Sequence, residues 1–133
     1  MLNTKKLLIK VLTSMKTLLS DLTLHTFTIS NPIYTNGAGG YYQRGNVVFV
    51  NARVYVNGTF PANDYNTVTG NGSFPTPALQ AALSVCFNSA DSASGALAVI
   101  NDNGSLVVQS GGKALTSSTI YITGAYVALG GGN

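Results

Sequence analysis

The first 22 residues constrain the fold most, because they form an amphipathic helical pattern whose apolar side needs a covering surface. At 3.6 residues per turn, apolar side chains fall at the a and d positions of successive heptads, and two more widen the stripe at e. Lysine, threonine and serine occupy the opposite side. The predicted helix spans residues 1–22, and its apolar stripe consists of Leu8, Val11, Leu12, Met15, Leu18, Leu19 and Leu22.

This stripe is too large to stay in water. Burying it is worth about 10 to 20 kcal/mol per chain, and a helix this short is marginal on its own. Three surfaces could cover the stripe: the chain's own β domain, a membrane surface, or copies of the same helix. Four lysines favour a membrane, whereas the threonine and serine side chains weaken that alternative. We expect a trimeric coiled-coil stem, because a stripe wider than a and d suits more than two helices.

A signal peptide is the other interpretation of a lysine-bearing apolar N-terminus. Lys10 and Lys16 interrupt the apolar run, and no small-residue cleavage site follows. No run approaches the roughly 18 apolar residues that a membrane span needs. We therefore expect no membrane insertion, and synthesis in the cytoplasm without a signal peptide.

The remaining residues, 23–133, are enough for one β domain with its own core. Only 8% of the 133 residues are charged, and glycine, asparagine, serine and threonine supply the polar surface, a composition that favours turns and strands. The net charge of +3 is misleading, because four of the five lysines precede residue 17. Arginine, lysine and aspartate balance in the body, which argues against nucleic acid as a partner.

Alternating and β-branched stretches predict strands at residues 24–29, 46–57, 83–87, 96–100, 105–109 and 119–129. The run from Asn101 to Gly104 is the strongest hairpin signal, and Gly124 permits a bulge or close approach in the last strand. No βαβ rhythm is present. The pattern therefore predicts a mainly β fold, an antiparallel β-sandwich or jelly-roll-like head that follows the helix.

The strand at residues 46–57 is predicted to be the centre of the domain. Its one face is wholly apolar, and the opposite face begins apolar with Val47 and Phe49 before it turns polar. We expect that end to be covered on both sides, by a second sheet or by a neighbouring subunit. The apolar face consists of Val48, Val50, Ala52, Val54 and Val56.

Three other stretches are predicted to be irregular. Asn31-Pro32 and the glycine-rich run 36–40 bracket a loop, and residues 57–76 form the longest loop, of a length that is more often functional than merely connecting. Thr76 and Pro77 offer a start for one helical turn through Leu83.

Several segments resemble a known family. Residues 1–8, Met-Leu-Asn-Thr-Lys-Lys-Leu-Leu, look like the opening of small structural proteins of phages that infect Gram-positive gut bacteria. Residues 42–48, 99–108 and 115–126 resemble the head domains of phage receptor-binding and tail-fibre proteins, by their Val-rich strands and Asn-Gly hairpin taken in order. From first to last, these segments extend over roughly residues 41–128, which is most of the β domain.

The resemblance implies a homotrimer on the outside of a virion. Three β heads would cluster on a three-helix stem, bind host-surface saccharide, and attach to another virion protein through the N-terminal helix. The chain is shorter than the family pattern, with no long coiled-coil shaft and no β-helical shoulder. A non-enzymatic decoration protein or short head fibre, with no ligand of its own, is therefore the alternative.

Two groups of side chains are the candidates for contact with a saccharide. Sugar sites pair an aromatic face with hydrogen-bonding groups that match hydroxyls. Such residues also have ordinary structural uses, since tyrosines often cap a core and Asn-Asp runs often form turns. Tyr55, Tyr121 and Tyr126 are interpreted as structural. The candidates are Asn63, Asp64, Tyr65 and Asn66 in one loop, and Tyr41, Tyr42 and Arg44 in a second group.

Enzyme chemistry is not expected. The single histidine, His25, lies on an apolar strand face, where packing is its commoner role. Asp91 and Asp102 are separated by a turn-rich loop and a hairpin, unlike the paired carboxylates of a glycosidase. Cys86 is interpreted as a buried small hydrophobe. No loop offers the clustered carboxylates of a calcium site, so neither a metal nor a cofactor is expected.

Overall fold

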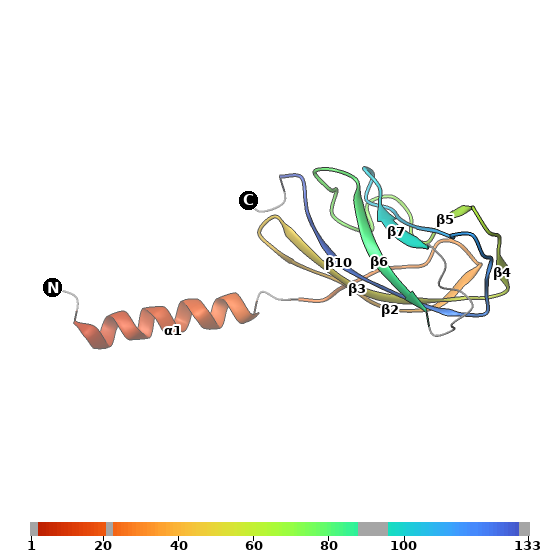
Figure 1. Cartoon of the computed structure of the whole chain (residues 1–133). Coiled ribbons are helices and arrows are strands. Elements are labelled where there is room, and N and C mark those ends of the chain that lie inside the picture. The colour runs from red at the N-terminus through yellow and green to blue at the C-terminus, as the bar shows by residue number, and fades with distance from the viewer. Residues whose placement is uncertain (1–2, 21–22, 88–95, 131–133) are drawn as a thin grey trace.

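The computed structural model describes residues 3–20, 23–87 and 96–130, and it gives no side-chain positions for residues 15–20. The chain is mainly β with one N-terminal helix, as the sequence predicts (Figure 1). The elements are α1 (Thr4–Ser20), β1 (His25–Thr26), β2 (Tyr34–Arg44), β3 (Val47–Val56), β4 (Thr59–Phe60), β5 (Tyr65–Thr67), β6 (Ala81–Phe87), β7 (Leu97–Ile100), β8 (Leu106–Gln109), β9 (Leu115–Thr116) and β10 (Thr119–Val127).

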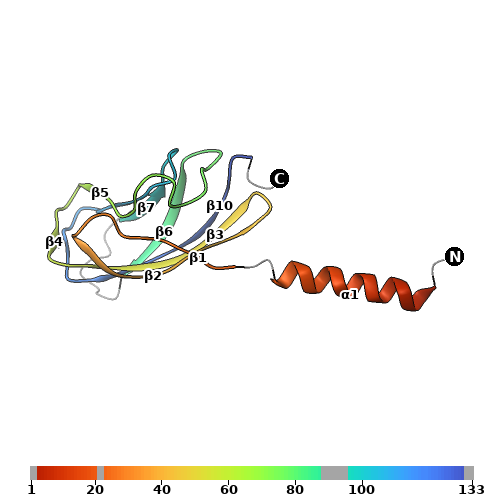
Figure 2. The ribbon, with the colours of Figure 1, turned by 180° about the vertical axis from the view of Figure 1, so that it is seen from behind.

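Eight strands form one antiparallel sheet in the order β1-β2-β3-β10-β6-β7-β8-β5, and β4 pairs with β9 apart from it. The sheet curls, so that β7 lies across the interior from β3 and β10 (Figure 1, Figure 2). The two ends of the sheet are also linked, because Ile29 forms a bridge with Thr69 and the Ser30 amide donates to the Val68 carbonyl at 2.9 Å. The curled antiparallel sheet therefore encloses a single core.

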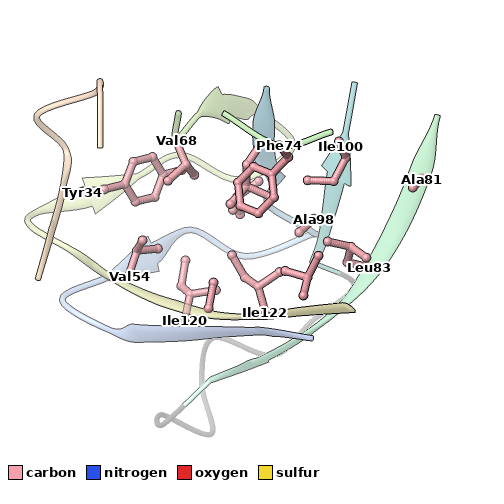
Figure 3. Packing of buried hydrophobic residues seen from close by; sticks show 14 of the residues in the cluster. Tyr34, Val54, Val68, Phe74, Ala81, Leu83, Ala98, Ile100, Ile120 and Ile122 are labelled. Atoms are coloured by element: carbon pink, nitrogen blue, oxygen red, sulfur yellow. The ribbon is translucent and has the colours of Figure 1, made fainter. Parts of the chain in front are cut away.

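The core fills the space between the two halves of the curled sheet. Val54 of β3 and Ile120 and Ile122 of β10 point toward Phe74 and Ile100 from the opposite half (Figure 3). All five side chains are at most 2% exposed. Burial of such side chains, worth about 1.5 to 3 kcal/mol each, is what stabilises the fold.

Strand β3 confirms the predicted alternation, because Val48, Val50, Ala52, Val54 and Val56 are all buried. The prediction for the opposite face is not met within one chain. Val47 is 37% exposed and Phe49 is 48% exposed, so no second sheet among the described residues covers them. A neighbouring subunit as their cover stays a prediction.

The glycine-rich run 36–40 is part of strand β2, so the predicted loop is wrong there. A Cβ at Gly39 would collide with the Asn51 carbonyl of β3, and one at Gly40 with the His25 carbonyl of β1. The glycines thus let three backbones approach closely, a role that glycine has in strands as well as in turns. The irregularity that the sequence suggested is a bulge between Thr35 and Ala38.

Segment 76–83 is also different from its prediction, because it contains no helical turn. The Ala78 amide donates to the Val127 carbonyl at 2.9 Å, and the Leu129 amide to the Thr76 carbonyl at 2.7 Å. Pairing with the end of β10 satisfies backbone groups that a helical turn would otherwise satisfy internally. The chain then enters β6 at Ala81.

The remaining strand predictions are largely confirmed. The hairpin β7–β8 turns at Asn101 to Gly104, where Gly104 has a φ of +79°. In β10, a Cβ on Gly124 would lie 2.8 Å from Leu83 Cδ2, so the expected close approach is present. The predicted strand 24–29 is reduced to β1 and the bridge at Ile29, and the predicted loop 57–76 contains the short strands β4 and β5.

Helix α1 projects from the β domain in both views (Figure 1, Figure 2). Asn3 caps it, because its Oδ1 accepts from the Lys6 amide at 2.9 Å. Within the predicted stripe, Leu8, Val11 and Leu12 are 57%, 48% and 56% exposed, so the β domain does not cover them. This helix is not long and apolar enough to cross a membrane. Side chains of Met15, Leu18, Leu19 and Leu22 lie outside the described part.

Two buried tyrosines allow a matched test of the core. Tyr126 donates its hydroxyl to the Pro75 carbonyl at 2.8 Å, whereas no described residue bonds the Tyr34 hydroxyl. Burial raises the pKa of each phenol well above the ordinary value for tyrosine, so both side chains stay neutral. We expect Tyr126→Phe to lower the free energy of unfolding by about 1 kcal/mol, and Tyr34→Phe to leave it unchanged or raised. Urea denaturation measures both; an equal loss in the two variants would contradict the assignment.

Candidate functional site

The predicted ligand loop, residues 63–66, is held firmly at the end of β8. Ser110 is its anchor and is 8% exposed. The Ser110 hydroxyl donates to the Pro61 carbonyl at 2.5 Å and accepts from the Asp64 amide at 3.0 Å. The Ser110 amide in turn donates to the Asp64 carbonyl at 2.9 Å. Asn63 has a φ of +54°, a conformation that asparagine tolerates better than most residues.

The same loop presents polar and aromatic groups to solvent. Asp64 Oδ1 accepts from the Tyr65 amide at 2.8 Å, and the Tyr65 side chain is 68% exposed. Asn63 and Asp64 are exposed, while Asn66 is half-buried. A carboxylate therefore lies beside an open ring, which is the combination that the sequence predicts for a sugar contact.

The second predicted group does not form one cluster. Successive side chains of a strand point to opposite faces, so Tyr41 lies inside and Tyr42 and Arg44 lie outside. The Tyr41 ring stacks on His25 with 4.8 Å between centroids, and it lies 5.5 Å from Phe74. Tyr41 thus closes one edge of the core.

The two predicted groups lie at opposite ends of β2. Tyr34, at the start of the strand, packs edge-on against Phe60 at 6.4 Å, and the charge of Asp64 adds to burial in raising its pKa. Tyr42 is eight residues further along β2, about 25 Å away at the usual rise of a strand. One small ligand cannot bridge the two groups.

A third set of side chains lies on the outward surface of β2, β3, β10 and β6, and only Tyr42 and Arg44 of this set were among the predicted ligand residues. Directly paired residues of an antiparallel sheet point to the same side, so the register defines rows across this surface. One row is Ala38, Arg53, Tyr121 and Cys86. We call this surface, turned away from the core, the outer face.

The outer face has an apolar half and a polar half. In the apolar half, Val47 and Phe49 pair with Val127 and Ala125, and Val127 is 55% exposed. The polar half holds two open cavities, of about 350 and 460 Å³, that share Arg53 and Tyr121. We call these two cavities together the outer groove. The first is lined by Leu24, Ala38, Gly39, Tyr42, Asn51, Ala52, Arg53 and Tyr121, and the second by Asn36, Gly37, Arg53, Tyr55, Thr119 and Tyr121.

Of the seven predicted ligand residues, Tyr42 alone lines the outer groove. Tyr126 is structural as predicted, but Tyr55 and Tyr121 face outward, and Tyr121 is 41% exposed. The polar side of the strand at 46–57 was the available signal, since Asn51, Arg53 and Tyr55 alternate along it. The register that brings Tyr121 beside Arg53 depends on pairing between distant segments.

Among the described residues, those considered for catalysis do not form one cluster. His25 is exposed and stacks on Tyr41. Cys86 is exposed on the outer face, so the prediction of a buried thiol is wrong: it occupies the outward position next to the partly buried Val85. Asp91 lies outside the described residues. Within the described part, no three His, Cys, Asp or Glu side chains gather as metal ligands.

The fold and the site define a mainly β antiparallel protein with an N-terminal helix and an open polar groove on its sheet. Comparisons with family models, with curated proteins and with solved structures found no match to this chain.

Ser110 gives a direct test of the loop geometry. Ser110→Ala removes the hydroxyl that joins Pro61 to the Asp64 amide, and leaves that partly buried amide without its side-chain partner. We expect a loss of about 1 to 3 kcal/mol in the free energy of unfolding. Ser84→Ala, at an exposed position of β6, is the matched control and should change it by less than about 0.5 kcal/mol. Equal effects in the two variants would contradict the anchoring role.

Proposed function

We propose that this chain is a structural adhesin of a phage virion, a homotrimer whose β heads bind saccharide on the host surface. The observation that carries the proposal is the uncovered apolar stripe of α1, whose Leu8, Val11 and Leu12 are about half exposed in the single chain. A helix with this pattern is stable in water only with a partner. Copies of the same helix would supply such a partner, because each presents a matching apolar stripe.

Three α1 helices would pair as a short coiled-coil stem and bring three jelly-roll-like heads together. Weak contacts between single heads and surface sugars then act at high effective concentration, which raises the overall affinity without any new contact. The polar side of the helix, with its lysines, stays available to another virion protein. The resemblance to phage receptor-binding proteins supports this exterior position.

The loop at residues 63–66 is the first surface for sugar contact. Asp64 and Tyr65 offer a carboxylate that accepts hydrogen bonds and a ring face that stacks on pyranose C–H groups. The loop is anchored by Ser110, so little conformational entropy is lost when it binds. A non-enzymatic binding role fits these groups.

A decoration protein without a ligand is the second candidate. The apolar half of the outer face favours it, because Val47, Phe49 and Val127 are exposed together and would pack well against another virion protein. In that case the protein would co-purify with capsids or tails and show no affinity for host-wall polysaccharide.

The stem is tested by one charge on each side of the helix. Val11→Asp places a carboxylate in the stripe, whereas Thr13→Asp places one on the opposite side. We expect the full chain and Thr13→Asp to have three times the 13.8 kDa chain mass in solution, and Val11→Asp to be mainly monomeric. Light scattering coupled to gel filtration measures all three. A monomeric full chain, or a Val11→Asp variant with the same solution mass as the full chain, would refute the trimeric stem.

The sugar loop is tested by binding to host-wall polysaccharide. We expect Asp64→Ala and Tyr65→Ala each to weaken binding about tenfold, since each removes one anchoring contact worth roughly 1.4 kcal/mol. Tyr65→Phe keeps the ring and should bind nearly as the wild type does. Asp102→Ala removes an equal charge from the β7–β8 turn and serves as control. Unchanged binding in both alanine variants would refute a role for this loop.

A further inference from the structure

We propose that the outer groove binds an anionic saccharide, with the Arg53 guanidinium pairing with its acidic group and the Tyr121 ring stacking on a sugar ring. This inference rests on the proposed adhesin function and names the class of ligand and a second binding surface for it. It concerns different residues from the loop at 63–66, so the two can be tested separately.

Arg53 occupies the middle of the groove. It lies on β3 directly opposite Tyr121 on β10 and Ala38 on β2, and it lines both cavities. Among the described residues, none makes a hydrogen bond or ion pair with this guanidinium, and neither Asp64 nor Asp102 lines the groove. Within the described part of the chain, the groove thus carries a positive charge that no acidic lining residue balances, which favours an anionic occupant. A guanidinium binds carboxylate and phosphate through two parallel hydrogen bonds.

The walls of the groove suit a sugar better than a compact ion. Tyr42 lines the first cavity, Tyr55 the second, and Tyr121 belongs to both, so each cavity offers ring surface. Asn51 and Asn36 add an amide to each cavity, and amides pair with hydroxyl groups as both donors and acceptors. Two open cavities that share a wall can hold neighbouring units of a saccharide chain, with the acidic unit at Arg53.

The groove is built on a firm scaffold. β3 pairs with β10 along nine residue pairs, and the inward neighbours of Arg53, Ala52 and Val54, are buried in the core. The bulge between Thr35 and Ala38 turns Asn36 and Gly37 toward the rim of the second cavity. The binding groups are therefore positioned before the ligand arrives, which lowers the entropic cost of binding.

A second copy of the chain is the competing occupant of this surface. The apolar half of the outer face, at Val47, Phe49 and Val127, is the part that suits such a contact. The polar half offers Arg53 and exposed Asn51, and none of its described lining residues is an acid that could pair with Arg53 of another copy. Charge complementarity thus favours the saccharide in the groove.

The test uses the full chain and three soluble probes. Oligogalacturonate carries carboxylates, poly(glycerol phosphate) carries phosphates, and dextran is neutral. We expect calorimetry to detect binding of one or both anionic probes and no binding of dextran. Arg53→Ala should weaken that binding about tenfold or more, Arg53→Lys by less, and Tyr121→Ala by about tenfold, while Tyr121→Phe changes little. Added salt should weaken binding of the wild type.

Lys113→Ala is the charge-matched control, because Lys113 is exposed between β8 and β9 and does not line the groove. It should bind each probe within about twofold of the wild type. Equal binding by Arg53→Ala and wild type, or equal binding of dextran, overturns the inference. A change in solution mass on Arg53→Ala also overturns it, since the groove would then be a contact between copies.

The two proposals fail in different ways. Host-wall polysaccharide that binds the full chain, loses affinity in Tyr65→Ala and keeps it in Arg53→Ala leaves the adhesin function standing and refutes the groove. A trimer that binds no host-wall polysaccharide refutes the adhesin function. Binding of an anionic probe that depends on Arg53 would still support the groove as a site in that case.

Discussion

The long antiparallel pairing of β3 with β10 is the constraint on which the rest of the structure depends. Its nine residue pairs fix which side chains face the core and which face outward. A shift of one residue would exchange the two sets and place Arg53 and Asn51 in the interior, where an unpaired charge is very costly. The same register thus produces both the core of Val54 and Ile122 and the groove on the outer face.

The strand content and the central alternation could be predicted from the sequence. Apolar residues recur at every second position within residues 46–57 and 119–129, so the pattern is visible without knowledge of the fold. The hairpin at Asn101 to Gly104 was equally clear, since its turn needs a glycine with positive φ. The prediction failed where backbone segments from distant parts of the sequence determine the local structure. Gly39 and Gly40 belong to a strand because β1 and β3 pass against them, and residues 76–78 pair with β10.

The candidate site was harder to predict than the fold for the same reason. Residues 63–66 are neighbours in sequence, so their grouping needed no knowledge of the fold. Arg53 and Tyr121 are 68 positions apart (121 − 53), and only the strand register brings them side by side. Tyr41 and Tyr42 show the opposite case, because adjacent residues of one strand point to different sides. Local clustering in sequence is thus a poor guide to clustering on a sheet.

Few backbone contacts connect the segment after α1 to the rest of the sheet. Past the residues between α1 and Thr23, the chain joins the sheet through two residue pairs, His25 with Tyr41 and Thr26 with Gly40, and then through the bridge at Ile29. Any mechanical tension along α1 is transmitted first to this two-residue edge strand. The sheet would therefore begin to yield under load by peeling at β1, while the long ladders behind it stay intact.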